Sequence, residues 1–401
     1  MLSKSIFKKS IQRALILSAA TSSLVTMNAM SLEPQSLITS LTVEEKRIAL
    51  AQEKMPEVLA VFSSEVTHFS AKWKKTTSFQ SAQDLIKRYG NQLWLLAKEK
   101  INSSNNADDR SLYWTRLLSS RVMRTVSPQF AITPPQLDSL LSMLEQGSRG
   151  RTDLEFSKGA MKKIILTGFD PFLLNRNINQ SNPSGVAALM LDGKVIKYYG
   201  ITAEINTVMI PVRYEDFDQG TIEALLAPYY ALNNVDMVVT VSMGRKEFDL
   251  ERFPGKRRSV TAPDNLDIVF GGTQVAPKIP YLQGKLLSGS EFVEFSLPVA
   301  QMQLASGPYK VIDNHQITTL EKTYKPEKLS ELDNKVAVNG AGGGYLSNEI
   351  SYRSIRIRNI IGSSIPTGHI HTPRIKQFEP EIESKIVEQI RAMLEKSLPA
   401  L

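Results

Sequence analysis

The sequence predicts an α/β fold, a mostly parallel sheet flanked by helices, preceded by a small all-helical domain. Two patterns support this prediction. Apolar residues recur at the helical period from Thr42 to about Leu144, whereas short β-rich runs alternate with helical stretches from Lys163 onward. Such alternation is typical of a parallel sheet covered by helices. The composition is that of a globular protein, since 42% of the 401 residues are hydrophobic and 22% are charged.

The first 30 residues have the order of a secretory signal. A basic start at residues 4–13 is followed by an uncharged stretch at 14–27 and by small residues that end around Ala29. We therefore expect residues 1–30 to be a signal peptide and the mature protein to be exported, either periplasmic or secreted. The alternative is a retained membrane anchor, because the cleavage region is imperfect. No later stretch approaches the roughly 18 consecutive apolar residues of a spanning helix, so we expect no stable membrane span after cleavage.

Residues 31–147 are expected to form the helical N-terminal domain. Thr42 and Glu45 have the spacing of a capping box at a helix start. The pair Pro134-Pro135 is interpreted as a loop between helices. One predicted helix places four apolar residues on one face, namely Ile86, Tyr89, Leu93 and Leu96. The polar, glycine-containing residues 148–161 are expected to be a linker.

Residues 162–401 are expected to form the α/β domain. Short apolar runs predict strands near residues 163–167, 207–212, 235–241 and 335–338. A final amphipathic helix is expected at 379–396, with an apolar face made by Ile382, Ile386, Ile390 and Met393. Catalytic groups in such folds lie at the carboxyl ends of the strands, so the site is expected there.

The composition narrows the chemistry that this domain can perform. The chain has no cysteine, which excludes disulfides, thiol catalysis and thiolate metal sites. Only His369 and His371 have a spacing that suggests metal ligands, and two residues do not complete a metal site. We therefore expect no metal and no cofactor. The net charge of +8 is spread along the chain, and no nucleic-acid partner is expected. The glycine run at 340–344 fits neither of the common nucleotide-binding patterns.

Four strand ends carry residues with catalytic potential. Together they supply a hydroxyl at a Gly-rich strand-to-helix turn, two histidines and a carboxylate, which are the parts of a catalytic triad. The motifs are Thr-Gly-Phe-Asp-Pro-Phe at 167–172 with Asn-Pro-Ser at 182–184, Glu-Arg at 251–252 with Pro-Asp-Asn at 263–265, Gly-Tyr-Leu-Ser-Asn at 344–348, and Gly-His-Ile-His-Thr-Pro at 368–373.

At these motifs the sequence resembles pyroglutamyl peptidase I, the pyrrolidone carboxyl peptidases. The resemblance covers about Lys162 to Pro373, and the order of glutamate, nucleophile and histidine is the order of that family. It implies a pyroglutamyl-peptidase-like fold and a hydrolase that removes an N-terminal pyroglutamyl, or similarly blocked, residue from a peptide substrate. With the expected signal peptide, the chain would be a divergent, exported member. The nucleophile of the family is a cysteine, and Ser347 occupies its position here.

The resemblance also implies a role for each matching residue. Ser347 is expected to be the nucleophile, His371 its base and Glu251 the group that orients the histidine. The other implied residues are Phe169, Phe172 and Asn182 in the substrate pocket, and Gly344 and Thr261 in the oxyanion site. Thr261 stands where the family has an arginine, and losing one oxyanion donor costs on the order of 3 kcal/mol. Arg257 and Arg258 lie nearby in sequence and are candidates to replace it.

Each of these residues also has a structural interpretation. Ser347 could be a helix cap, His371 a core histidine, and Glu251 a surface partner of Arg252 or Arg245. Phe169 and Phe172 could be plain core residues. For the whole protein, the alternatives to a pyroglutamyl hydrolase are an inactive member that binds a peptide or pyroglutamyl group, and a hydrolase of another cyclic amide or an ester. The sequence leaves the oligomeric state open, and a homo-oligomer is compatible with it.

Overall fold

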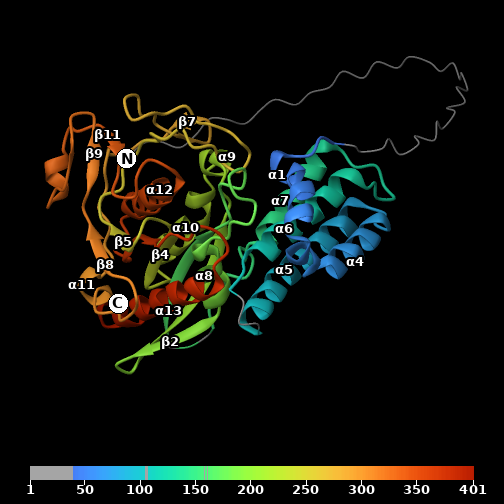
Figure 1. Cartoon of the computed structure of the whole chain (residues 1–401), viewed down its shortest axis with the longest axis horizontal. Helices are drawn as coiled ribbons and strands as arrows, with labels where there is room; N and C mark the ends of the chain where they lie inside the picture. The colour runs from blue at the N-terminus through green and yellow to red at the C-terminus, as the bar shows by residue number, and fades with distance from the viewer. Residues whose placement is uncertain (1–38, 104–106, 158, 160) are drawn as a thin grey trace, which may run out of the picture. The chain divides into compact units, whose positions relative to one another are not determined.

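The computed structural model describes residues 39–103, 107–157, 159 and 161–401, so the expected signal peptide lies outside the described residues. All described residues belong to one compact unit, in which a helical segment precedes an α/β segment (Figure 1). No helix of the described ranges is long and apolar enough to cross a membrane.

The helical segment follows the predicted pattern with one difference. Thr42 and Glu45 form the expected capping box at the start of the first helix. The two prolines at 134–135 do not form a loop, because Pro134 is the first residue of a helix capped by Thr133 and Gln136. Proline is favoured at that position, where its missing N–H has no helical partner. The helices are α1 (Val43–Lys46), α2 (Ile48–Lys54), α3 (Pro56–Ala60), α4 (Ser63–Lys74), α5 (Phe79–Ser103), α6 (Arg110–Thr125) and α7 (Pro134–Ser148).

The α/β segment is built on a seven-stranded, mostly parallel sheet, which confirms the predicted fold class. Only the pairs β2–β3 and β12–β5 are antiparallel. In spatial order the strands are β2 (Lys194–Tyr198), β3 (Ile201–Ile210), β1 (Lys162–Phe169), β4 (Met237–Met243), β12 (Thr367–Thr372), β5 (Phe248–Glu251) and β8 (Val311–Asn314). Since β1, β4 and β12 run parallel, their carboxyl ends meet at one edge of the sheet.

Helices cover both faces of the sheet. Residues of β1 alternate between the two faces: Ile164 and Leu166 pack in the core with α8 and α13, and Ile165 packs with α10 and α12. The last helix confirms the predicted apolar face, which is buried from Ile386 to Met393. The helices are α8 (Pro183–Leu191), α9 (Tyr214–Asp218), α10 (Thr221–Leu232), α11 (Val299–Met302), α12 (Leu346–Ile361) and α13 (Pro380–Ser397).

The strand predicted at 335–338 lies outside the main sheet. It corresponds to β11, which pairs with β9 in a separate three-stranded sheet built from the segment between α11 and α12. A short hairpin forms a third sheet. The strands are β6 (Tyr281–Leu282), β7 (Lys285–Leu286), β9 (Ile317–Thr319), β10 (Thr323–Tyr324) and β11 (Ala337–Asn339).

Buried polar contacts join the helical segment to the α/β segment. The carboxylate of Asp170, directly after β1, pairs with Arg116 at 3.1 Å and with Arg149 at 2.7 Å. The buried carboxylate of Asp109 accepts the backbone N–H of Asn182 at 3.3 Å. The described residues between α7 and β1 form no helix or strand. The loops at the carboxyl end of β1 are therefore held from the helical side.

Candidate active site

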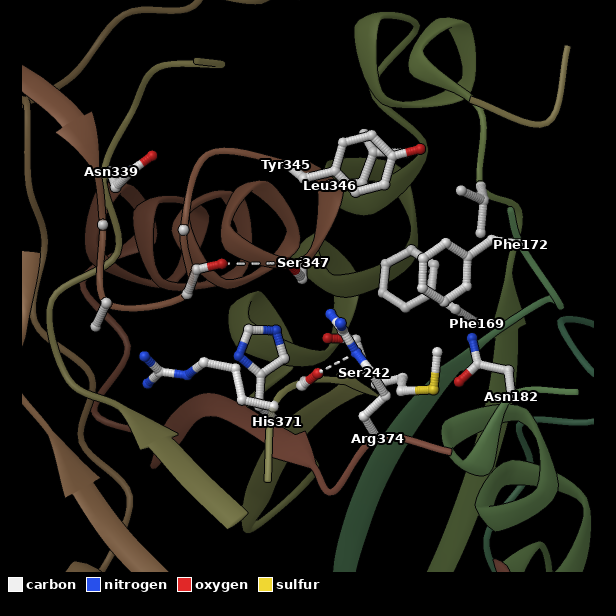
Figure 2. Close-up of a pocket in the computed structure, with 18 of the residues that line it drawn as sticks. Phe169, Phe172, Asn182, Ser242, Asn339, Tyr345, Leu346, Ser347, His371 and Arg374 are labelled. Atoms are coloured by element: carbon white, nitrogen blue, oxygen red, sulfur yellow. Dashed lines mark hydrogen bonds between the residues drawn. The ribbon is translucent and has the colours of Figure 1, made fainter. Parts of the chain in front are cut away.

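A cavity of about 350 Å³ lies at the edge where β1, β4 and β12 end. Its walls come from the loop after β1, the end of β4, the glycine-rich turn before α12, the first residues of α12 and the end of β12 (Figure 2). The cavity brings together five of the predicted site residues, which are Phe169, Phe172, Asn182, Ser347 and His371.

The imidazole of His371 is held by a buried carboxylate. Nδ1 of His371 lies 2.5 Å from Oε1 of Glu251, whose side chain is 0% exposed. The second carboxylate oxygen accepts a hydrogen bond from Asn314 Nδ2 at 2.8 Å. Burial raises the pKa of Glu251, and the neighbouring His371 opposes that rise. A carboxylate at Nδ1 places the proton of a neutral imidazole there, which leaves Nε2 as an acceptor.

This contact decides between the two interpretations of Glu251. The adjacent antiparallel strands β5 and β12 bring the carboxylate and the imidazole together, because Asp249 is paired with His371 in the ladder. Glu251 is not a surface partner of either candidate arginine. Arg245 pairs with Asp249, and the ion pairs of Arg252 are with Asp313 and Glu294.

Ser347 lies in the first turn of α12 and lines the cavity. It is the second residue of the helix, and the N-cap position belongs to Tyr345, so Ser347 is not the helix cap. Its hydroxyl donates to the carbonyl of Gly342 at 3.3 Å. Among the hydrogen bonds of the described residues, none joins Ser347 to His371, although both side chains border the same space (Figure 2).

His369 is a buried neighbour of the site and does not line the cavity. Its ring is held between two hydroxyls, with Nδ1 2.8 Å from Thr240 Oγ1 and Nε2 2.8 Å from Ser242 Oγ. Burial, together with the adjacent His371, holds the pKa of His369 well below its usual range. The two imidazoles meet edge to face at 4.8 Å between centroids. His369 is therefore a neutral support for His371.

The two phenylalanines occupy different environments. Phe169 is only 3% exposed and stacks on Phe217 with 6.3 Å between ring centroids, so it is both a core residue and part of the cavity wall. Phe172 is half-buried. Asn182 caps α8, and its Nδ2 donates to the carbonyl of Asp170 at 2.9 Å. Asn182 thus shapes the loop that carries both rings.

The structure does not bring the predicted oxyanion residues to the cavity. Thr261 is exposed and outside the lining. Gly344 also lies outside the lining, and its carbonyl accepts the backbone N–H of Ser259 at 3.1 Å. A side chain at Gly344 would meet the Ser259 hydroxyl at 1.9 Å, which explains the glycine.

The candidate replacements for the missing arginine are also engaged elsewhere. Arg258 is buried and forms ion pairs with Glu349 and Asp218. The guanidinium of Arg257 pairs with Glu291. Neither arginine lines the cavity.

Comparison with known proteins assigns the chain to a family. The model of the PA0049 N-terminal domain matches residues 27–145, and the model of the PA0049 C-terminal domain matches residues 163–294 and 299–376. The chain belongs to the PA0049 family. The uncharacterized protein PA0049 of Pseudomonas aeruginosa is 26% identical over 395 residues, which cover 75% of this chain and 71% of that protein.

Solved structures of pyrrolidone carboxyl peptidase from Pyrococcus furiosus are also similar to this PA0049-family chain. One mutant structure is 22% identical, covers 60% of this chain and 99% of its own, and has a TM-score of 0.39. The structures of the enzyme and its cysteine-free mutant give 21% identity, 59% and 99% coverage and a TM-score of 0.38.

Two residues of the candidate site of the PA0049-family protein were not predicted from the sequence. Asn314, which holds Glu251, lies in a stretch without a recognisable motif. Arg374 lines the cavity. It directly follows the His-Thr-Pro motif, and this position in the sequence could have indicated that it lies near the site. The same motif-free stretch contributes Gln316 and Thr318 to the rim.

Proposed function

We propose that this protein is an exported hydrolase of the pyroglutamyl-peptidase type. It removes an N-terminal pyroglutamyl, or similarly blocked, residue from a peptide through Ser347, His371 and Glu251. The observation that carries the proposal is the 2.5 Å contact between His371 Nδ1 and the buried Glu251, in the wall of the cavity that Ser347 also lines. A hydroxyl is a weak nucleophile without a base, and an oriented imidazole supplies that base.

The proposed reaction proceeds through an acyl-enzyme. Nε2 of His371 takes the proton of Ser347 as Oγ attacks the carbonyl carbon of the blocked residue. The amide C–N bond breaks, and the leaving amine receives that proton. Water then attacks the ester carbon and gives a proton to His371. The ester C–O bond breaks, His371 returns that proton to Oγ of Ser347, and the acid product leaves. Before the first step, Ser347 must rotate away from the Gly342 carbonyl, to which it now donates. Catalytic hydrogen bonds often tighten only when the substrate binds.

The first turn of α12 is the candidate oxyanion site. Its backbone N–H groups have no partner within the helix, and the helix dipole adds positive potential at Ser347. Donors of this kind stabilise the negative oxygen of a tetrahedral intermediate. In this proposal, the rings of Phe169 and Phe172 form the flat apolar walls against which a lactam ring packs.

A binding protein without turnover is the second candidate function. Two observations favour it. The hydroxyl of Ser347 donates to the carbonyl of Gly342 and not to His371. Of the described arginines near Thr261 in sequence, namely Arg257 and Arg258, neither lines the cavity. Export is also part of our proposal, and it rests on the order of charge, apolar run and small residues at 1–30.

Hydrolysis of a chromogenic pyroglutamyl amide tests the proposed function. We expect turnover by the wild-type chain, and loss of at least a thousandfold in kcat for both Ser347→Ala and His371→Ala, because the two groups act as one unit. His68→Ala, in the exposed part of α4, is the matched control and should retain full activity. Binding of the pyroglutamyl group without any turnover would favour the second candidate.

A further inference from the structure

Two arginines supply the positive side chains that line the cavity. They are Arg245 and Arg374, and among the described residues of the lining none is Asp or Glu. The first turn of the 16-residue helix α12 adds further positive potential. A concave site of one sign attracts ligands of the opposite sign, so the cavity favours an anionic ligand.

Arg374 is held in place by the loops at the strand ends. Its backbone N–H donates to the carbonyl of Arg245 at 2.7 Å, and its Nε donates to the carbonyl of Gly244 at 3.2 Å. Gly244 in turn donates to the carbonyl of Thr372 at 2.9 Å. A side chain at Gly244 would lie 2.5 Å from Cβ of His371, so only glycine allows this close approach. The guanidinium and the imidazole therefore share one rigid corner of the cavity.

The two arginines of the lining differ in their partners. Arg245 pairs with the buried Asp249 at 3.0 Å. Arg374 forms no ion pair with any carboxylate of the described residues, and its guanidinium donates to the Gly244 carbonyl through Nε. Its side chain reaches into the space between the ring of His371 and the rings of Phe169 and Phe172 (Figure 2). The charge of Arg245 is therefore paired within the protein, whereas the guanidinium of Arg374 is available to a ligand.

We propose that Arg374 binds a carboxylate of the ligand, so that the substrates are short acids. This inference rests on the proposed function and names its substrate class: a pyroglutamyl dipeptide whose free C-terminal carboxylate follows closely after the scissile amide. The apolar end of the cavity takes the ring, and the guanidinium takes the carboxylate with two parallel hydrogen bonds. A volume of about 350 Å³ is near the lower end of the roughly 300–1,000 Å³ of ligand sites, which suits a small ligand.

Calorimetric binding to the Ser347→Ala variant separates recognition from turnover. The ligands are pyroglutamyl-alanine and its C-terminal amide, which differ only in the charge of the terminal group. We expect the acid to bind about tenfold more tightly, the effect of a charge-assisted hydrogen bond. Adding Arg374→Gln should remove this preference, and Arg374→Lys should keep part of it. The preference should also shrink in 1 M salt, which screens charges.

Arg391→Gln is the control, since Arg391 is exposed on α13 and pairs only with Glu395 among the described residues. It should leave the preference for the acid unchanged. Equal binding of acid and amide, or binding of neither, overturns the inference. So does an unchanged preference in Arg374→Gln.

The wild-type chain distinguishes this failure from failure of the proposed function. Hydrolysis of acid and amide with equal kcat/KM would contradict the proposed role of Arg374 but support the proposed hydrolase function. The opposite result is preferential binding of the acid that is lost in Arg374→Gln, with neither ligand hydrolysed. It would support Arg374 as a ligand-binding residue and contradict the proposed hydrolase function.

Discussion

Arg149 lies 2.7 Å from the carboxylate of Asp170, and this ion pair joins the helical segment to the chain between Phe169, the last residue of β1, and Phe172 in the following loop. Asp170 is 0% exposed and also faces Arg116 at 3.1 Å. Two positive side chains from α6 and from the residue after α7 thus meet one carboxylate at the carboxyl end of β1. The helical segment contributes directly to the position of the cavity wall.

Asp170→Asn is therefore expected to destabilise the protein. It keeps the size of the side chain but leaves two buried guanidiniums without their common carboxylate, which costs about 3 to 5 kcal/mol. Urea unfolding of the full chain measures the loss. Asp84→Asn, on the exposed side of α5, should stay within about 0.5 kcal/mol of the wild type. A loss below about 1 kcal/mol for Asp170→Asn would show that the arginines are satisfied by other groups.

The two phenylalanines should respond differently to truncation. Phe169→Ala opens a cavity in the core beside Phe217 and should cost about 3 to 5 kcal/mol of folding free energy. Phe172 is half-buried, so Phe172→Ala should cost less stability while still weakening the binding of pyroglutamyl ligands. Thermal unfolding and calorimetric binding of both variants give the comparison. Unchanged ligand binding in Phe172→Ala would remove this residue from the proposed pocket.

Ser347→Cys tests whether the nucleophile alone separates this chain from the cysteine enzymes that it resembles. A thiolate is intrinsically the better nucleophile, so the variant should hydrolyse a pyroglutamyl amide detectably. A serine-directed phosphonate should label the wild type, and His371→Ala should abolish the labelling. If the wild type neither labels nor turns over and the folded cysteine variant is inert, the oxyanion site is missing. The binding protein would then be the better description.

Stability should fall as the pH rises towards 8. Burial raises the pKa of Glu383 from 4.5 to about 8, and the neighbouring Asp108 opposes its ionisation while Arg110 favours it. Between these values the folded protein keeps a proton that the unfolded chain has lost. The free energy of unfolding therefore decreases by up to about 1.4 kcal/mol per pH unit and levels off above pH 8.

The matched pair Glu383→Gln and Glu388→Gln identifies the source of that slope. Both residues are on α13, but Glu383 is buried and Glu388 is exposed. Urea unfolding between pH 5 and 9 should show a reduced slope for Glu383→Gln and a wild-type slope for Glu388→Gln. Identical slopes in both variants would place the proton elsewhere, and the buried Asp109, whose pKa is also raised by burial, is the next candidate.

Local sequence patterns predicted those strands whose burial shows as a short run of apolar residues. The apolar strands β1, β3 and β4 were found because each is buried on both faces. The strands β5 and β12 were not predicted, because they contain the polar residues Glu251, His369 and His371. The hydrogen-bond partners of these side chains lie on other strands and are not apparent from the local sequence. The strand before Ser347 was assigned to the main sheet, whereas β11 pairs with the neighbouring strand of its own segment.

The site was predictable where a motif fixes the residue type, and not where long-range geometry decides. Motif order indicated Ser347, His371 and Glu251. The path of a loop is not encoded in this way, so Gly344 was expected in the oxyanion site although it does not line the cavity. Thr261 does not line the cavity, because the loop that carries it lies at the surface.

The burial of His369 limits how many protons the two histidines can hold. Because its pKa is held well below the usual range, His369 stays neutral when His371 gains a proton. Although the two imidazoles stand 4.8 Å apart, only His371 is then left to accept a proton from Ser347 in the proposed reaction. In the proposed hydrolase, the acid limb of the kcat/KM profile should therefore fall tenfold per pH unit and never a hundredfold.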